Sequence, residues 1–181
     1  RDGATINELN TVRKHLSQVK GGQLARRAHG AQIVALILSD VIGSPLDVIA
    51  SGPTAPDPTT FADAQSIIER RGLTGQLPVS VVQHIARGAR ADPSTGSALD
   101  TPDARNPIFA RVHNVIIADN AMACDAAVRQ AQALGFNTLL LSTYVQGEAR
   151  EVAKVFAAIA KEITQSNRPV ARPACVIAGG E

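Results

Sequence analysis

The chain contains 181 residues with a mass of 18.9 kDa, which fits one domain or a large piece of a bigger protein. Hydrophobic residues make up 45% of the chain and charged residues 19%, and this balance excludes a disordered chain. No apolar run is longer than that from Ile33 to Leu38, which is far shorter than the ~20 residues that a membrane-spanning helix needs. We therefore expect a globular protein without a membrane partner.

The net charge of +2 comes from 18 basic and 16 acidic residues, which are interspersed along the chain. Aromatic residues make up only 3% of it. Because a clustered basic run and stacking aromatic rings are both missing from this pattern, we expect no nucleic-acid partner. Cys124 and Cys175 each lie in an apolar stretch, which indicates buried free thiols and a cytoplasmic protein.

The two ends of the sequence are unlike each other. The chain begins with the polar run Arg1-Asp2-Gly3, which is not typical of a signal peptide. It ends with a predicted strand that runs into a glycine turn at Gly179-Gly180 before Glu181. We expect the sequence to be a fragment of a longer protein.

The first half of the chain alternates helices with long loops. Apolar side chains at Leu9, Val12, Leu16 and Val19 recur every three to four residues, which predicts an amphipathic helix over residues 7–19 with this stripe buried. The short apolar run at 33–38 predicts a buried strand. The remaining segments are a loop over 41–60, helices over about 61–71 and 79–88, and a linker-like stretch over 91–107.

The second half alternates strands with helices. We expect strands over 115–118, 138–141 and 174–178, and helices over 121–134 and 148–163. Apolar strands that alternate with helices predict a parallel sheet with right-handed crossovers and helices on both faces. The predicted fold class is therefore α/β, with a Rossmann-like three-layer sheet.

Polar or glycine residues follow each predicted strand: Ser39-Asp40, Asp119-Asn120, Ser142-Thr143 and Gly179-Gly180-Glu181. Ligands of open α/β sheets bind beyond the carboxyl ends of the strands. The carboxylates of Asp40, Asp119 and Glu181 would suit a divalent metal ion and the phosphates that it bridges. Alternatively, the strands simply leave the core through polar residues, and Asn120 caps the next helix.

The loop Ser51-Gly52-Pro53-Thr54 combines two hydroxyl groups with a glycine that permits close backbone approach. This combination suits a phosphate or a polyol ligand. Alternatively, it is an ordinary turn before the helix that begins near Phe61, with Asp57 and Thr60 as cap candidates.

One flank of the first helix is polar and fills an arc of about 80° beside the apolar stripe: Asn10, Arg13, Ser17 and Lys20. Lys14 lies about 40° further round, on the solvent side. The flank would form an anion site, with Lys20 next to the flexible Gly21-Gly22 pair. Alternatively, it is a solvated flank whose aliphatic stems cover the core. His15, on the exposed side of this helix, has no partner at metal-ligand spacing.

Several longer motifs occur in order along the chain: Gly3-Ala4, Glu8 to Ser17, Lys20-Gly21-Gly22, Leu38 to Gly43, Ile49 to Thr54 with Asp57, Ala118-Asp119-Asn120, Gly147-Glu148-Ala149 and Gly179-Gly180-Glu181. Together they resemble the bacterial and animal glycerate 2-kinases, which are often labelled hydroxypyruvate reductases. The resemblance covers nearly the whole chain. One departure is Ser44, because the family usually has an aspartate after Gly43.

The resemblance implies ATP- and Mg²⁺-dependent phosphorylation of D-glycerate to 2-phosphoglycerate, in a cleft between a large α/β domain and a smaller C-terminal domain. Residues 1–181 would form the C-terminal portion of the large domain, and the second domain would lie outside this chain. Glycerate would be the small-molecule partner, and a homodimer is also compatible with the sequence.

On this resemblance, Asp40 would hold the metal ion or act as base on the glycerate hydroxyl, while Arg13 and Lys20 would neutralise the substrate carboxylate and the transferring phosphoryl group. The residues assigned to the substrate are Asn10, Lys14, Ser39, Ser51, Gly52 and Thr54. Those assigned to the nucleotide are Asn120, Gly179, Gly180 and Glu181. We expect Asp40, Asn120 and Glu181 to lie together along one edge of the site. The side chains of Arg13 and Lys20 would extend over this edge.

Two other functions stay open at this point. The first is an NAD(P)H-dependent hydroxypyruvate reductase, although the chain has no Gly-x-Gly-x-x-Gly turn for a nicotinamide cofactor. The second is a folding or dimerisation unit without activity of its own, which is what we expect of the fragment in isolation.

Overall fold

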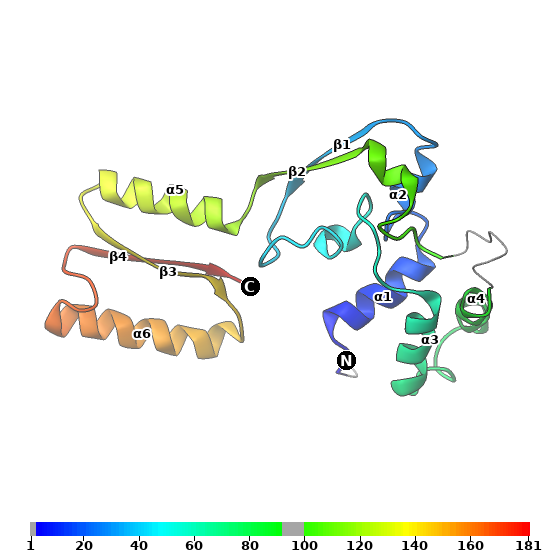
Figure 1. Cartoon of the computed structure of the whole chain (residues 1–181). Helices are drawn as coiled ribbons and strands as arrows, with labels where there is room; N and C mark the ends of the chain where they lie inside the picture. The colour runs from blue at the N-terminus through cyan, green and yellow to red at the C-terminus, as the bar shows by residue number, and fades with distance from the viewer. Residues whose placement is uncertain (1–2, 92–99) are drawn as a thin grey trace. The chain divides into compact units, whose positions relative to one another are not determined.

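Figure 1 shows the computed structural model of the chain, which describes residues 3–91 and 100–181. The chain forms two compact units, which we call unit 1 and unit 2. Unit 1 contains Arg1–Leu36 and Leu46–Val115, and unit 2 contains Ile37–Pro45 and Ile116–Glu181. The division falls within strands β1 (Ile33–Leu38) and β2 (Val112–Ala118), which pair with each other.

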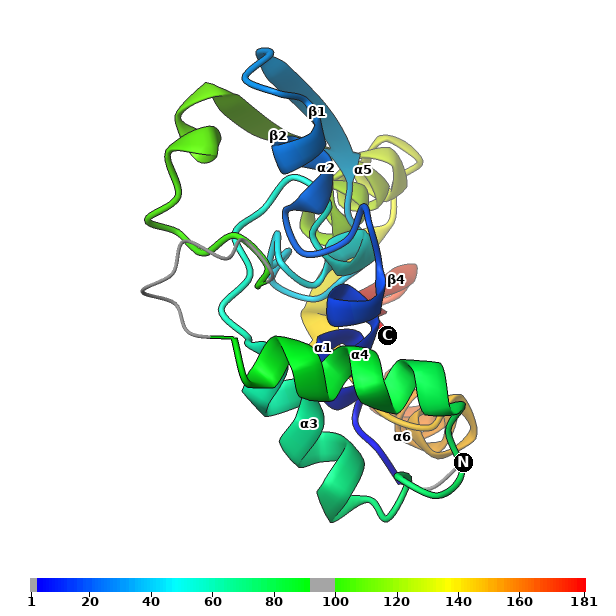
Figure 2. The ribbon, with the colours of Figure 1, turned by 90° about the vertical axis from the view of Figure 1, so that its right-hand side faces the viewer.

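Three helices of unit 1 pack around one apolar core (Figure 2): α1 (Ile6–Leu16), α3 (Phe61–Arg70) and α4 (Val79–Ala89). The buried side chains of this core are Phe61, Ala64, Ile68 and Ile85. Gly88 allows α4 to approach α3, because a methyl group at this position would overlap the ring of Phe61. Unit 1 also contains α2 (Gln23–Arg27) and two short 3₁₀ helices, η1 (Ile49–Ser51) and η3 (Pro107–Arg111).

Threonines begin two of these helices. Thr5 and Thr60 accept hydrogen bonds from the backbone N–H groups of Glu8 and Asp63, whose carboxylates accept from the threonine N–H groups in return. These reciprocal bonds satisfy N–H groups that have no partner within the helix. Of the two predicted cap candidates, Thr60 caps α3, whereas Asp57 does not and accepts a hydrogen bond from the Thr59 N–H instead.

Helix α1 buries its polar side. Asn10, Thr11, Lys14 and His15 are its buried residues, whereas Leu9 and Leu16 are 41% and 42% exposed. Three predictions are therefore wrong: that the apolar stripe is buried, that Lys14 faces solvent and that His15 is exposed. The helix also ends at Leu16, so Val19 lies outside it.

Distant acidic residues explain this reversal. The Lys14 ammonium group lies 3.2 Å from Asp57 Oδ1 and 3.8 Å from Asp47 Oδ2, and the Asp57 side chain is completely buried. A buried charge is tolerated when a partner of opposite charge accompanies it. Helical periodicity cannot detect these partners, because they lie more than 30 positions away from Lys14 in the sequence.

His15 has oxygen atoms at both ring nitrogens. Nδ1 lies 2.8 Å from the Thr11 carbonyl oxygen, and Nε2 lies 3.1 Å from Asp100 Oδ1. Because both oxygens accept hydrogen bonds, this geometry favours a ring that is protonated at both nitrogens. Burial opposes that charge, but the hydrogen bonds to Asp100 and Thr11 and the nearby Asp57 carboxylate outweigh it, so the pKa of His15 is raised.

We predict that unit 1 loses stability as the pH rises above the ordinary histidine value of about 6.5. The raised pKa of folded His15 gives a contribution to the free energy of unfolding that is fully present below that value and disappears as the pH passes the folded pKa. Urea unfolding at a series of pH values measures this slope. Asp100→Asn should flatten it, and His29→Asn, in an exposed loop, should not. An identical slope in Asp100→Asn would contradict the assignment.

Unit 2 contains the rest of the regular structure: α5 (Asn120–Ala133), β3 (Asn137–Val145), α6 (Ala149–Ser166) and β4 (Ala174–Gly180). Strands β3 and β4 are parallel, with Asn137 opposite Ala174 and Val145 opposite Gly180. Helices α5 and α6 cover opposite faces of this strand pair (Figure 1). The predicted order of strands and helices and the parallel pairing are confirmed.

The sheets are smaller than expected. Within the described residues, β1 pairs with β2 and β3 with β4, as two separate two-stranded sheets. The side chains of Val34, Leu36 and Leu38, which share one face of β1, are 61–71% exposed. The prediction of a buried strand is therefore wrong for this face. The predicted turn at Gly179-Gly180 is part of β4 instead.

The two cysteines are free, as predicted, with Cys124 buried and Cys175 partly buried. Among the helices of the described residues, none has the length and hydrophobicity required to span a bilayer.

Candidate active site at the strand ends of unit 2

A cavity of about 390 Å³ lies where the ends of β1, β2 and β4 meet the first turn of α5, and we call it the strand-end cavity. Its lining is Leu38, Ser39, Asp40, Ala118, Asp119, Asn120, Ala123 and Gly180. Leu38 and Gly180, which are 142 positions apart in sequence, therefore line one space, as the polar strand ends predicted. All of them belong to unit 2.

The two carboxylates of this cavity differ in their surroundings. Asp119 is the N-cap of α5, and its Oδ1 accepts a hydrogen bond of 2.8 Å from the Met122 N–H. The alternative that Asn120 caps this helix is therefore wrong. Asp40 is exposed, and among the described residues it has no hydrogen bond or ion pair from its side chain. Both oxygens of Asp40 are thus free for a ligand among the described residues, whereas Asp119 has one oxygen engaged in the cap.

Asn120 supports the cavity by bridging two strands. Its Nδ2 donates a 2.7 Å hydrogen bond to the Thr143 carbonyl oxygen at the end of β3. Its side chain also lies against Gly179 of β4, where a methyl group would overlap the Asn120 amide. A methyl group on Gly180 would overlap the Val145 carbonyl oxygen in the same way. Both glycines are therefore needed for close approach.

The predicted site of three carboxylates is not formed. Within residues 3–91 and 100–181, no three histidine, cysteine, aspartate or glutamate side chains lie close enough to hold a metal ion together. Glu181 lies instead beside a second cavity, and its N–H donates to the Val145 carbonyl oxygen. Asp40 and Asp119 remain, and Mg²⁺ in phosphate-transfer sites is commonly bound by one or two carboxylates together with substrate phosphates.

The loop after β1 is held by contacts of two serines. The Ser39 N–H donates to the Ala118 carbonyl oxygen at 2.9 Å, and the Ser44 hydroxyl donates to Ser39 Oγ at 2.9 Å. Ser39 is buried, so its contacts fix the position of the neighbouring Asp40. Ser44 replaces the aspartate that the resemblance leads one to expect, and it stabilises this loop.

The predicted substrate loop belongs to unit 1 and forms a left-handed turn. Ala50, Ser51 and Gly52 have φ values of +51°, +62° and +61°. The N–H groups of Gly21 and Gly22 donate to the Ser51 and Gly52 carbonyl oxygens at 2.8 and 2.7 Å. The Gly21-Gly22 pair therefore binds the loop through its backbone.

The side chains of this region also bind within unit 1. Lys20 Nζ donates to the Ala50 carbonyl oxygen at 3.3 Å, and the Ser51 hydroxyl donates to Asn10 Oδ1 at 3.2 Å. The Thr54 hydroxyl donates to Asn114 Oδ1 at 2.6 Å. These bonds give the loop a structural explanation, and its role in substrate binding stays a prediction.

The two remaining cations of α1 have different environments. Lys14 is committed to Asp57, as described above. Arg13 is exposed, and within the described part of the chain no ion pair involves it. Arg13 and Lys20 belong to unit 1, so their action on a ligand of the strand-end cavity stays a prediction.

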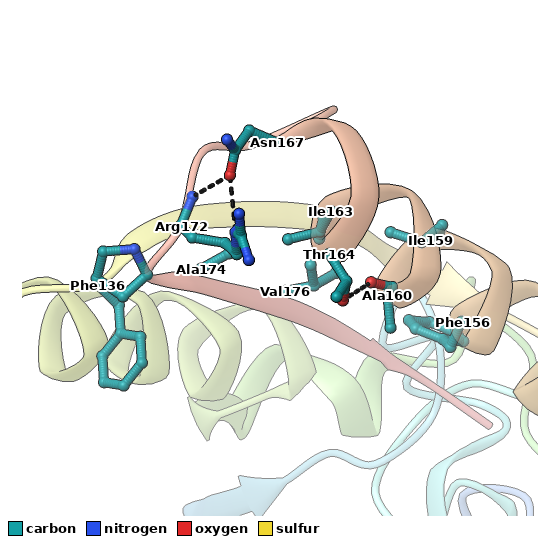
Figure 3. A pocket seen from close by; sticks show the side chains of 11 residues that line it. Phe136, Phe156, Ile159, Ala160, Ile163, Thr164, Asn167, Arg172, Ala174 and Val176 are labelled. Carbon is teal, nitrogen blue, oxygen red and sulfur yellow. Dashed lines mark hydrogen bonds between the residues drawn. The ribbon is translucent and has the colours of Figure 1, made fainter.

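A larger cavity of unit 2, about 1030 Å³, lies between α6 and the amino end of β4 (Figure 3). Most of its lining residues are apolar, among them Phe136, Phe156, Ile163 and Val176. Its ionisable lining residue is Arg172, whose Nε donates to Asn167 Oδ1 at 2.9 Å. The position at the amino end of a strand and the absence of a carboxylate from its lining make it a poor candidate for phosphate-transfer chemistry.

The chain resembles known proteins in sequence and in structure. Residues 1–86 match the family described as "Domain of unknown function (DUF4147)". All 181 residues align with a glycerate 2-kinase from Pyrococcus horikoshii at 44% identity, covering 39% of that protein. The crystal structure of glycerate kinase from Thermotoga maritima superimposes with a TM-score of 0.78 at 41% identity, over 99% of this chain and 39% of that one.

The chain is homologous to one segment of the glycerate 2-kinases. It spans 39% of the length of these relatives. A protein from Agrobacterium vitis that is named hydroxypyruvate reductase is 45% identical over 179 residues, covering 99% of this chain and 37% of that protein. The likeness confirms the resemblance that the sequence motifs indicated, and the mixed α/β fold is that of the corresponding glycerate kinase segment.

We predict that Gly179→Ala destabilises unit 2 by about 1–3 kcal/mol, the usual cost of overpacking. The added methyl group would overlap the Asn120 amide. Because Asn120→Ala removes that overlap, the double variant should lose less stability than the sum of the two single variants. Thermal unfolding measures all three, with Gly75→Ala as control because its position is open. Additive effects would show that the contact is absent.

We also predict that Ala50→Gly stabilises unit 1 modestly. The left-handed conformation costs an L-residue about 1–2 kcal/mol, and glycine avoids this cost. Glycine also has more conformational entropy in the unfolded chain, which offsets part of the gain. The expected net gain is about 0.5 kcal/mol in the free energy of unfolding. Ala86→Gly, in the middle of α4, should instead destabilise the protein. A loss of stability in Ala50→Gly would contradict the left-handed turn.

Proposed function

We propose that this chain is part of a cytoplasmic glycerate 2-kinase that transfers the γ-phosphoryl group of ATP to D-glycerate. The observation that carries the proposal is the carboxylate of Asp40, which has no partner among residues 3–91 and 100–181 and lies in the strand-end cavity beside Asp119 and the first turn of α5. Homology to glycerate kinases along the whole chain supports it. In the longer enzyme the chain would be the C-terminal portion of the large domain.

Asp40 would carry the chemistry. A glycerate hydroxyl oxygen attacks the γ-phosphorus, the bond from that phosphorus to the bridging oxygen of ADP breaks, and the hydroxyl proton passes to the Asp40 carboxylate or to solvent. Mg²⁺, bound by Asp40 and Asp119, would offset the negative charge that develops on the phosphoryl oxygens. Asp40 thus orients either the metal or the attacking hydroxyl.

The other assignments follow from position and charge. Arg13 and Lys20 would neutralise the glycerate carboxylate and the phosphoryl group. Asn10, Lys14, Ser39, Ser51, Gly52 and Thr54 would shape the substrate side, largely by holding loops through the contacts described above. Asn120, Gly179, Gly180 and Glu181 would form the nucleotide side. A homodimer is compatible with this arrangement.

A hydroxypyruvate reductase is the second candidate, and the name of the Agrobacterium vitis relative favours it. It would require a nicotinamide cofactor. The sequence has no glycine fingerprint for one, so the kinase is the better proposal.

The test is a chimera in which this chain replaces the matching segment of Thermotoga maritima glycerate kinase. We expect it to release ADP in the presence of glycerate, and Asp40→Asn to lower kcat by about 10²-fold or more. Asp125→Asn, on the exposed surface of α5, is the matched control and should keep full activity. Undiminished turnover in Asp40→Asn would refute the role of Asp40.

The same chimera distinguishes the two candidate functions. Oxidation of NADH with hydroxypyruvate, without ADP release from glycerate, would favour the reductase. The isolated 181-residue chain should be inactive in both assays, and glycerate turnover by it would refute the view that the chain alone is an incomplete enzyme.

A further inference from the structure

The loop after β1 holds Asp40 between two residues that are themselves fixed. On one side, the Ser39 N–H donates to the Ala118 carbonyl oxygen at 2.9 Å. On the other side, the Val41 carbonyl oxygen accepts two hydrogen bonds, from the Ser39 hydroxyl at 3.3 Å and from the Ser44 N–H at 3.0 Å. Both neighbours of Asp40 in the chain are therefore held by hydrogen bonds.

Ser44 makes two of the hydrogen bonds of this loop. Its hydroxyl group donates to Ser39 Oγ at 2.9 Å, in addition to the bond from its backbone N–H. A serine hydroxyl has a single proton, and that of Ser39 is directed to the Val41 carbonyl oxygen. Ser39 Oγ can therefore take part in a second hydrogen bond only as an acceptor. Because Ser39 is buried, Ser44 supplies the donor that water would supply at the surface.

Ser44 makes these contacts from an unfavourable backbone conformation. Its φ is +51°, in the left-handed region, where glycine is favoured over any residue with a Cβ atom. It directly follows Gly43, which has a φ of +73°. Strained conformations of this kind persist where the surrounding contacts hold them, and they are frequent at functional sites. The position therefore suits glycine by its backbone and serine only by its hydroxyl group.

We infer that Ser44 is a positioning residue for the Asp40 carboxylate. This inference rests on the proposed kinase function, in which Asp40 holds the metal ion or accepts the proton of the glycerate hydroxyl. The Ser44 hydroxyl holds Ser39 and the Ser44 N–H holds Val41, so the backbone of Asp40 between them is fixed beside the strand-end cavity. A small displacement of a reacting group has a large effect on the rate.

A positioning role and a merely structural role predict different effects of one substitution. Ser44→Gly removes the hydroxyl group and also removes the strain of the left-handed conformation. The loss of the hydrogen bond and the relief of strain offset each other in stability, so the unfolding temperature should stay within about 2 °C of the parent. The turnover number has no such compensation and should fall.

The test uses the chimera with Thermotoga maritima glycerate kinase that is proposed above. Ser44→Ala and Ser44→Gly should each lower kcat by about tenfold and leave the KM values for glycerate and ATP within about twofold. Ser44→Asn should return kcat to within about threefold of the parent, because asparagine tolerates the left-handed conformation and its amide can donate to Ser39 Oγ.

Ser166→Ala is the matched control. The Ser166 hydroxyl also donates a hydrogen bond within unit 2, to the Glu162 carbonyl oxygen at 2.9 Å, but it lies at the last residue of α6 and lines neither the strand-end cavity nor the loop after β1. This variant should keep the kcat and both KM values of the parent chimera.

A second measurement does not depend on activity. Amide hydrogen exchange of residues 39–44, followed by mass spectrometry in the same chimera, reports on the Ser39 and Ser44 N–H groups, which are both hydrogen-bonded. Exchange should become about tenfold faster in Ser44→Ala and Ser44→Gly. It should be unchanged in Ser166→Ala.

The outcomes separate this inference from the function on which it rests. Unchanged kcat in both Ser44→Ala and Ser44→Gly would overturn the positioning role and leave the kinase proposal standing. A loss of kcat that Ser44→Asn does not recover, or one without faster exchange, would overturn it as well. If the parent chimera releases no ADP with glycerate, the kinase proposal fails. Exchange then decides alone whether Ser44 holds Asp40: a faster rate in Ser44→Ala supports this, and an equal rate refutes it.

Discussion

The contact between Asn120 and Gly179 is the constraint on which the candidate site depends. Asn120 opens helix α5, donates to the end of β3 and lies against β4 where β4 has no side chain. The helix and the two strand ends are therefore fixed to one another by a single amide. Asp119 and Gly180, the immediate neighbours of these two residues, take their places in the strand-end cavity as a result.

Unit 1 is organised by buried charges as well as by its apolar core. Lys14 and His15 lie on the inner side of α1 because Asp57 and Asp100 reach them from distant loops. Removing one partner from such a pair leaves an uncompensated buried charge, which is costly. The exposed apolar residues of the same helix, such as Leu9 and Leu16, show that this polar contact decides which side of α1 is buried.

The chemistry that we propose needs few residues. Phosphoryl transfer depends mainly on position and on charge stabilisation, so one free carboxylate at a strand end is enough to begin it. Asp40 meets this description, whereas Asp119 has one oxygen engaged in capping α5.

The sequence by itself determined the order of strands and helices, the Thr60 cap and the polar strand ends at Asp40, Asp119 and Asn120. These features depend on periodicity and on neighbouring residues, which a single sequence displays. It also carried the motifs that revealed the relationship to glycerate 2-kinases. Tertiary structure alone decided the buried side of α1 and the separation of Glu181 from the other two carboxylates. Each of these depends on partners that are distant in sequence, such as Asp57 for Lys14, and local patterns contain no information on which distant groups will meet.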